Sequence, residues 1–334
     1  MNILGLYQVD SGCSYHRVVL PLGFMENIKA YVTNLPQEEI LAKGWDIVLF
    51  NRLSCFDADW NLVKKDLQAK IVMDIDDDWI LPSNHIAQIH YDNYRPRLEN
   101  NIIQADMVTC TNEKLANKIV KINPNVHIFE NALPYGYSQF KYSKTESDFI
   151  RLFWCGSVTH EHDLRILEYP IKRIDNPKVQ MVIGGYNDSN DISKKTWDKM
   201  INIFTNRKKI NHKILKGILP HEYMNLYQEA DIMLIPLENS SWHSCKSNLK
   251  ILEASVNEIP CIVSKVEPYS RDADAPVLWV EKQSDWNKHI NYLLKNKNAI
   301  IDYGKKLKEW AERNYNLSSI NKRRREAFAN LVKT

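Results

Sequence analysis

Glycine is scarce in this chain, at 10 of 334 residues against a usual share of about 7%. No G-x-G-x-x-G or G-x-x-x-x-G-K-[ST] segment occurs, so the standard dinucleotide-binding and P-loop fingerprints are absent. Half of the glycines end or follow predicted strands, where a ligand that approaches the backbone closely favours a residue without a Cβ. These are Gly12, Gly156, Gly184, Gly185 and Gly217.

Other absences narrow the class of protein. The six cysteines include no C-x-x-C pair, which excludes zinc-ribbon and redox motifs and suggests buried free thiols in a reducing compartment. The N-terminus lacks the basic and apolar regions of a signal peptide, and no apolar run approaches the ~18 residues that cross a membrane. We therefore expect a cytoplasmic protein without a membrane span. The net charge of +3 neither requires nor excludes a nucleic-acid partner.

Short apolar runs alternate with longer amphipathic stretches along the whole chain. They are too short for helices and almost continuously apolar, as parallel strands covered on both faces should be. The runs are 2–7, 46–50, 70–74, 106–110 and 126–130, and then 150–155, 178–183, 212–217, 231–236, 260–264 and 276–280. Helical patterns lie between them, so the alternation predicts parallel α/β sheets with right-handed crossovers.

A polar, aromatic segment without periodicity interrupts the alternation at 135–149 and is predicted to be a linker. We therefore predict one Rossmann-like domain over 1–134 and a second over 150–304. Helices over 305–334 are expected to pack back towards the first domain. Two parallel sheets of this kind would face a cleft, and their ligands bind beyond the carboxyl ends of the strands.

One segment of the second domain, 243–264, combines a loop, a helical pattern over 246–256 and a strand. The spacing of Lys246, Lys250 and Glu253 predicts that they share one helix face. Ser247 and Asn248 stand at the predicted helix start, where N–H groups and the helix dipole attract phosphate. The residues alone support two interpretations equally: a site in which lysine meets diphosphate and glutamate meets ribose, or a solvated charged face.

The same segment resembles the GT-B glycosyltransferases, close to the retaining enzymes that carry a nucleotide-binding E-x7-E motif. Glu253-Ala254 and 258–264 match the family run E-A-…-G-x-P-V-V-x-S, and 217–237 matches the stretch before it. Residues 151–164 resemble the first strand and phosphate-side loop of the family's C-terminal domain. The likeness covers most of 150–270, whereas the N-terminal half matches only by element order and by 11–17. Cys245 stands where the family's first glutamate would be, which leaves the donor sugar and the stereochemical outcome open.

The resemblance implies a GT-B fold and a hexosyl- or pentosyltransferase. Such an enzyme moves a sugar from a nucleotide-sugar donor to an acceptor hydroxyl, with retention and without a metal ion or other cofactor. The implied donor-binding residues are Gly156, Ser157, His160, Gly217, Lys246, Ser247, Asn248, Lys250 and Glu253. The residues implied on the acceptor or phosphate side follow the first strand: Gly12, Ser14, His16 and Arg17.

An aspartate cluster follows the predicted strand at 70–74. It fits a metal-binding D-x-D motif as in GT-A enzymes, an acid–base or acceptor role in a GT-B cleft, or simple helix capping and loop solvation. Because two separate sheets argue against GT-A, we interpret Asp74, Asp76 and Asp77 as candidate catalytic carboxylates without a metal.

The acceptor is left open by the sequence. Basic clusters at 207–209, 305–308 and 322–325 suit a polyanion, such as DNA with hydroxymethylated bases, for which binding would depend strongly on salt. A glycan acceptor fits the motifs equally. The replacement at Cys245 also allows a non-catalytic GT-B-like protein that binds a nucleotide sugar or a glycan.

Overall fold

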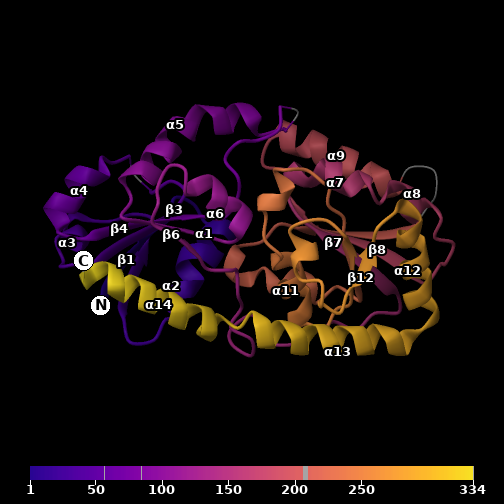
Figure 1. The fold of residues 1–334 in the computed structure, drawn as a ribbon. Helices are drawn as coiled ribbons and strands as arrows, with labels where there is room; N and C mark the ends of the chain where they lie inside the picture. Colours follow the sequence, from indigo (N-terminus) through magenta and orange to yellow (C-terminus); the bar gives the residue numbers. More distant parts are fainter. Residues whose placement is uncertain (56, 84, 206–209, 334) are drawn as a thin grey trace. The chain divides into compact units, whose positions relative to one another are not determined.

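The computed structural model describes residues 1–55, 57–83, 85–205 and 210–333. The chain divides into two compact units. Unit 1 contains Met1–Pro134, Ser244–Ser247 and Tyr315–Thr334, and unit 2 contains Tyr135–His243 and Asn248–Asn314. In Figure 1 each unit is a sheet with helices on both sides.

The sheet of unit 1 has six parallel strands in the order β2-β1-β3-β4-β5-β6. They are β1 (Asn2–Leu6), β2 (Lys29–Thr33), β3 (Ile47–Asn51), β4 (Lys70–Ile75), β5 (Met107–Cys110) and β6 (Val126–Ile128). The apolar runs predict five of these strands but not β2. This edge strand has no buried residue, and its sequence KAYVT does not form a continuous apolar run.

Helices of unit 1 cover both faces of its sheet. They are α1 (Gly12–Ser14), the π-helix η1 (Tyr15–Val19), α2 (Leu20–Gly23), α3 (Glu38–Leu41), α4 (Trp60–Leu67), α5 (Gln88–Gln104), α6 (Glu113–Ile119) and α14 (Leu317–Lys333). Along β3, Val48 and Phe50 enter the core beneath α4, α5 and α6, whereas Ile47 and Leu49 enter the core beneath α2 and α14. This period of two is that of a strand buried on both faces.

Side chains of two polar residues cap helix starts in this unit. The side chain of Asn112 accepts a hydrogen bond from Leu115 N at 3.0 Å and caps α6. The side chain of Asp59 accepts a hydrogen bond from Asn61 N at 3.0 Å and caps α4. The C-terminal α14 packs Phe328 into the core, and its Asn321 side chain donates to Pro21 O at 2.9 Å.

The sheet of unit 2 has six parallel strands in the order β12-β11-β10-β7-β8-β9. They are β7 (Ile150–Cys155), β8 (Val179–Tyr186), β9 (Asn211–Lys216), β10 (Ile232–Ile235), β11 (Cys261–Ser264) and β12 (Leu278–Val280). All six correspond to predicted runs. The chain between Tyr135 and Phe149, predicted as a linker, belongs to this unit.

Helices again lie on both faces of the sheet. The longer ones are α7 (Glu161–Arg165), α8 (Glu168–Lys172), α9 (Asp191–Thr205), α11 (Leu249–Val256), α12 (Gln283–Lys295) and α13 (Lys297–Asn314). The short ones are η2 (Val158–His160), η3 (Pro220–Glu222), α10 (Met224–Tyr227), η4 (His243–Cys245) and η5 (Tyr269–Arg271). Trp197 of α9 and Trp286 of α12 enter the same buried cluster as Trp154 of β7.

The strand orders place a topological switch point in each sheet. In unit 1 the chain leaves β1 towards β2 and then continues on the opposite side of β1 with β3. In unit 2 it leaves β7 towards β8 and β9 and then continues on the opposite side of β7 with β10. Ligands of open parallel sheets bind at the carboxyl ends of the strands that flank such a point. The segments after β1 and β3, and after β7 and β10, are therefore the ones to inspect.

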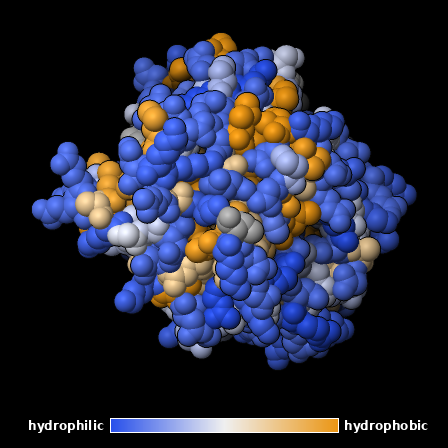
Figure 2. Space-filling model, turned by 60° about the vertical axis from the view of Figure 1, so that its left-hand side comes forward, coloured by the Kyte–Doolittle hydropathy of each residue, from blue (hydrophilic) through white to orange (hydrophobic). Residues whose placement is uncertain are grey.

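The surface in Figure 2 is mostly hydrophilic, with apolar side chains in small separate groups. Ile89 and Leu35, for example, are 78% and 79% exposed, which is ordinary for scattered surface residues. No helix of the described residues is long and apolar enough to span a bilayer.

Candidate functional site

A buried ion pair lies at the carboxyl end of β4 in unit 1. The Arg17 side chain donates to both oxygens of Asp74, from Nε at 2.9 Å and from NH2 at 2.8 Å. Thr109 Oγ1 and Asn51 Nδ2 donate to the same carboxylate at 2.6 and 3.1 Å. Each oxygen of Asp74 thus accepts two hydrogen bonds, and the residue is only 2% exposed. This geometry suits a structural anchor better than a proton acceptor.

Arg17 belongs to η1, directly after β1. Its NH1 also donates to Phe129 O and to Asn131 Oδ1, both at 2.9 Å. Burial opposes the charge of Arg17, but Asp74 more than compensates and raises its pKa above the ordinary value. Arg17 therefore ties η1 to β4 and to the segment after β6.

The next aspartates pair with cations of their own. Arg52 Nε donates to Asp76 Oδ1 at 2.7 Å, and Lys246 Nζ donates to Asp77 Oδ2 at 2.8 Å. Burial alone raises the pKa of Asp76, but the Arg52 guanidinium holds it well below the usual range. Asp76 is therefore ionised and weakly basic.

The fourth aspartate, Asp78, pairs with Lys118. Side-chain cations thus balance all four carboxylates, which explains how four negative charges coexist within five residues without requiring a metal ion. Arg52 reaches this cluster from the end of β3 with a left-handed φ of 54°, and its NH2 lies 3.6 Å from Cys13 Sγ. The sequence prediction omitted Arg52 and Cys13, although both follow the strands that flank the switch point.

The other predicted residues after β1 lie together at this edge. Gly12 opens α1, the buried Ser14 closes it, and His16 follows in η1 at 9% exposure. Ser14 is held by Ser11, whose Oγ accepts the Ser14 N–H at 3.2 Å. Sequence and structure therefore agree that this turn lies at the carboxyl end of β1.

The predicted helix over 246–256 is wrong at its start, because α11 begins at Leu249. The segment Ser244–Ser247 belongs to unit 1, where Asn112 Nδ2 donates to Cys245 O at 2.7 Å. Lys246 consequently does not share a helix face with Lys250 and Glu253. These tertiary hydrogen bonds outweigh a local pattern that fits a longer helix.

The neighbours of Lys246 are also placed by unit 1. Ser247 Oγ accepts from Asn131 Nδ2 at 2.9 Å. Cys245 packs into the apolar core at 1% exposure, and burial raises the pKa of its thiol to about 11. A buried, neutral thiol therefore stands where the resemblance predicts the first glutamate of the motif.

In unit 2 the predicted residues gather at the end of β7. Lys250 Nζ donates to Cys155 O at 2.7 Å and lies 5.2 Å from the centre of the Trp154 ring. A Cβ on Gly156 would approach that ring to 2.9 Å and Lys250 Nζ to 3.3 Å. The loop from Gly156 through Ser157 thus passes directly beside the Lys250 ammonium.

A second glycine makes this approach possible. Gly185, at the end of β8, has a φ of +97°, and a Cβ there would lie 2.2 Å from Gly156 O. Gly217, after β9, donates its N–H to Tyr186 O at 2.7 Å, which places it further along the same edge. Asn248, also predicted to bind the donor, directly precedes α11, and its Nδ2 donates to Asp272 Oδ2 at 2.7 Å.

Glu253 is buried on α11, at 5% exposure. The Tyr227 hydroxyl donates to Glu253 Oε2 at 2.6 Å and lies 3.3 Å from Cys155 Sγ. Burial raises the pKa of Tyr227 well above its ordinary value, so the phenol stays a neutral donor. Sequence reasoning missed Tyr227, although it lies in the stretch that resembles the family.

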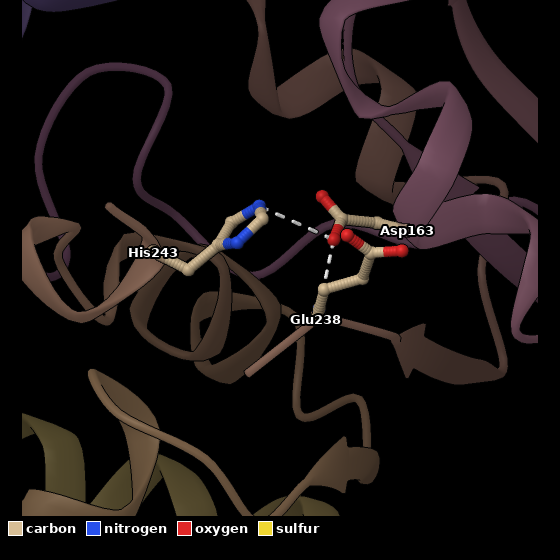
Figure 3. A group of neighbouring side chains, drawn as sticks. All are labelled: Asp163, Glu238 and His243. Carbon is tan, nitrogen blue, oxygen red and sulfur yellow. Dashed lines mark hydrogen bonds and ion pairs between the residues drawn. The ribbon is translucent and has the colours of Figure 1, made fainter. Parts of the chain in front are cut away.

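Asp163, Glu238 and His243 come together in the segments that follow β7 and β10 (Figure 3), and His160 adjoins Asp163. Asp163 Oδ2 lies 2.7 Å from His160 Nδ1, and Asp163 Oδ1 accepts the Glu238 N–H at 2.9 Å. His243 Nε2 faces Asp163 Oδ1 at 3.4 Å. Burial alone raises the pKa of Asp163, but the hydrogen bonds from the histidines hold it well below its usual range. The sequence predicted only His160 here. The sequence offers one signal for Glu238 and His243, which is that both lie in the segment after the apolar strand β10.

The basic clusters are partly used within the molecule. Lys306 pairs with Asp302, Lys308 with Glu258 and Arg323 with Glu130, while Arg324 is buried. The cluster at 207–209 lies outside the described residues. These pairings give no support to a cationic surface for DNA.

Solved structures resemble this fold over the length of the chain. Sucrose-phosphate synthase from Thermosynechococcus elongatus is 12% identical with a TM-score of 0.68, over 99% of both chains. HepE from Anabaena, solved with UDP, is 13% identical with a TM-score of 0.65, over 99% of this chain and 100% of that one. A UDP-forming trehalose-phosphate synthase from Burkholderia xenovorans is 11% identical with a TM-score of 0.63, over 88% of this chain and 76% of that one.

No family model matches the chain, and no curated protein matches it. The structural neighbours are GT-B glycosyltransferases. The two six-stranded parallel sheets with flanking helices match that architecture, so the predicted GT-B fold class is confirmed.

Proposed function

We propose that the protein transfers a sugar from a nucleotide-sugar donor to an acceptor hydroxyl, with the donor bound to unit 2. The observation that carries the proposal is the pair Lys250 and Glu253, three residues apart on α11 at the switch point between β7 and β10. One supplies a cation beside the Gly156 loop, and the other supplies a buried carboxylate. A nucleoside diphosphate requires this combination of charge for phosphate and acceptor for ribose.

The roles of these residues follow from their surroundings. Lys250, held at the end of β7 by Cys155 O, offsets the charge that develops on the leaving diphosphate. Glu253, oriented by Tyr227, accepts hydrogen bonds from ribose hydroxyls. Transfer with retention, as the resemblance around Glu253-Ala254 implies, is part of the proposal.

The solved neighbours favour a uridine donor and a hexose. HepE from Anabaena has been solved with UDP, with UDP-glucose, and with UDP and glucose together. We therefore include a UDP-hexose as the first donor to test. Hydrogen bonds to acceptor hydroxyls are assigned to the ionised Asp76 and to Arg52 in unit 1, whereas Asp74 anchors Arg17.

Calorimetric titration of the full chain with UDP and UDP-sugars tests the donor site. Lys250→Ala and Glu253→Gln should each weaken UDP binding about tenfold or more, because each removes a charged contact worth at least about 1.4 kcal/mol. Lys172→Ala is the matched control, since Lys172 is paired with Glu168 on α8. Binding of UDP by both site variants with wild-type affinity would show that the site is misplaced.

Activity needs a separate readout. Incubation with UDP-sugars and a panel of sugar acceptors should release UDP and give a glycosylated product, whose anomeric configuration proton NMR reports. A protein that binds UDP-sugars tightly but releases no UDP from any of them would be a binding protein of the same fold.

A further inference from the structure

We propose that Asp163, Glu238 and His243 form a binding site for a divalent metal ion of the Zn²⁺ or Mn²⁺ class, with coordination positions open towards the donor phosphates. The ligand atoms of the three residues lie within 4.8 Å of one another. Only the link to phosphate rests on the proposed function. The sequence alone predicts a metal-free site, and it is the fold that brings these side chains together.

The spacing of the ligand atoms fits a shared ion. His243 Nε2 and Asp163 Oδ1 are 3.4 Å apart. Two ligands at about 2.1 Å from one ion in tetrahedral geometry are separated by roughly 3.4 Å, so the spacing is compatible with a shared ion. In Figure 3 the His243 ring faces the Asp163 carboxylate, and the Glu238 carboxylate lies beside it. Imidazole and carboxylate together are typical ligands of Zn²⁺ and Mn²⁺.

Neighbouring groups contact the second polar atom of two of these ligands and so orient them. Ser240 Oγ lies 2.8 Å from His243 Nδ1, the ring nitrogen opposite the one that faces Asp163. His160 Nδ1 lies 2.7 Å from Asp163 Oδ2, the oxygen turned away from His243. Metal-binding histidines and carboxylates are commonly held through their second polar atom in this way, and this support strengthens metal affinity.

The charge balance gives an independent reason for a cation. Asp163 is 2% exposed, yet within the described ranges no lysine or arginine forms an ion pair with Asp163 or Glu238. In unit 1, by contrast, Asp74 and Asp76 each have an arginine. Asp163 accepts the Glu238 N–H and lies beside two imidazoles, but no lysine or arginine of the described chain offsets the repulsion between its carboxylate and that of Glu238.

The position of the cluster determines what else the ion would meet. Asp163 follows the loop after β7, and Glu238 and His243 follow β10, so the cluster lies at the same switch point as Lys250. Glu238 is exposed, which leaves one side of the cluster open to solvent. Three protein ligands with open positions are typical of metal sites that take a substrate oxygen.

Metal binding by the full chain tests the inference directly. After treatment with EDTA and its removal, titration with Mn²⁺, followed by electron paramagnetic resonance, and competition for Zn²⁺ with a chromophoric chelator should show one saturable site. Glu238→Gln and His243→Gln should each lower the affinity at least tenfold, and His160→Gln, which changes only the supporting shell, by a smaller factor. The matched controls are Glu281→Gln and His212→Gln, two exposed residues of unit 2 that should bind as wild type.

The outcomes separate this inference from the donor site. Absence of saturable metal binding, or equal affinity in the Glu238, His243 and control variants, would overturn the inference, and UDP binding in EDTA would still support the donor site. One bound metal ion that disappears in these two variants supports the inference even if UDP does not bind. Circular dichroism of the metal-free variants checks that a loss of binding is not a loss of fold.

Discussion

Tyr227 donates its hydroxyl to Glu253 at 2.6 Å, and both side chains are buried. The bond holds Oε2 of the Glu253 carboxylate in place. The phenol ring itself packs edge-on against Phe153, with ring centres 5.2 Å apart. Orientation and packing are therefore separate contributions of Tyr227, and a substitution can remove one without the other.

Tyr227→Phe should weaken binding of UDP about tenfold, because a hydrogen bond to a charged group contributes about 1.5–3 kcal/mol. The ring packing remains, so the thermal midpoint should fall only by the contribution of this one hydrogen bond. Calorimetry with UDP and with 2′-deoxy-UDP measures the effect, which should be smaller for the ligand that lacks a ribose hydroxyl. Equal losses for both ligands would contradict a role through Glu253. Tyr292→Phe, on the exposed side of α12, is the control.

Arg17→Met should destabilise unit 1 by about 3–5 kcal/mol, because it leaves Asp74 as a buried charge without its partner. Chemical denaturation followed by tryptophan fluorescence measures the loss. The double substitution Arg17→Met with Asp74→Leu should recover part of the stability, since it removes both charges. A double variant no more stable than Arg17→Met would argue against the ion pair as the cause.

Asp76 should make the protein acid-sensitive. Its pKa in the folded state is held well below the ordinary value by Arg52, so its contribution to stability is present above the unfolded pKa, near 4. The contribution is lost as the pH falls from there through the folded pKa. Thermal midpoints from pH 7 to pH 3 should therefore fall more steeply for the wild type than for Asp76→Asn. Parallel curves would contradict the assignment. Asp188→Asn, an exposed aspartate of unit 2, should follow the wild type.

Gly185→Ala should destabilise unit 2 by at least about 1–3 kcal/mol. The residue has a φ of +97°, and a Cβ would lie 2.2 Å from Gly156 O, so both conformation and space oppose any side chain. Gly12→Ala is the matched control, because no atom lies within 4 Å of the Cβ position there. Differential scanning calorimetry compares the two, and equal midpoints would refute the argument.

Much of the fold can be predicted from the sequence, since the signals are local. Eleven of the twelve described strands coincide with predicted runs, and Asn112 and Asp59 cap helix starts by chemistry that acts within three residues. The exceptions are equally physical. Strand β2 is not predicted because KAYVT does not form a continuous apolar run, and the predicted extension of α11 to Lys246 is prevented by hydrogen bonds from Asn112.

The candidate sites likewise depend partly on local sequence signals and partly on tertiary contacts. The sequence alone determined the alternation of strands and helices, the spacing of Lys250 and Glu253, and the positions of glycine at strand ends. Only the tertiary structure decided which charges meet. Arg17 pairs with Asp74 across 57 residues, and Asp163 accepts the Glu238 backbone N–H across 75. The reason is the parallel sheet, which brings the carboxyl ends of neighbouring strands to one edge, so that residues far apart in the chain share one site.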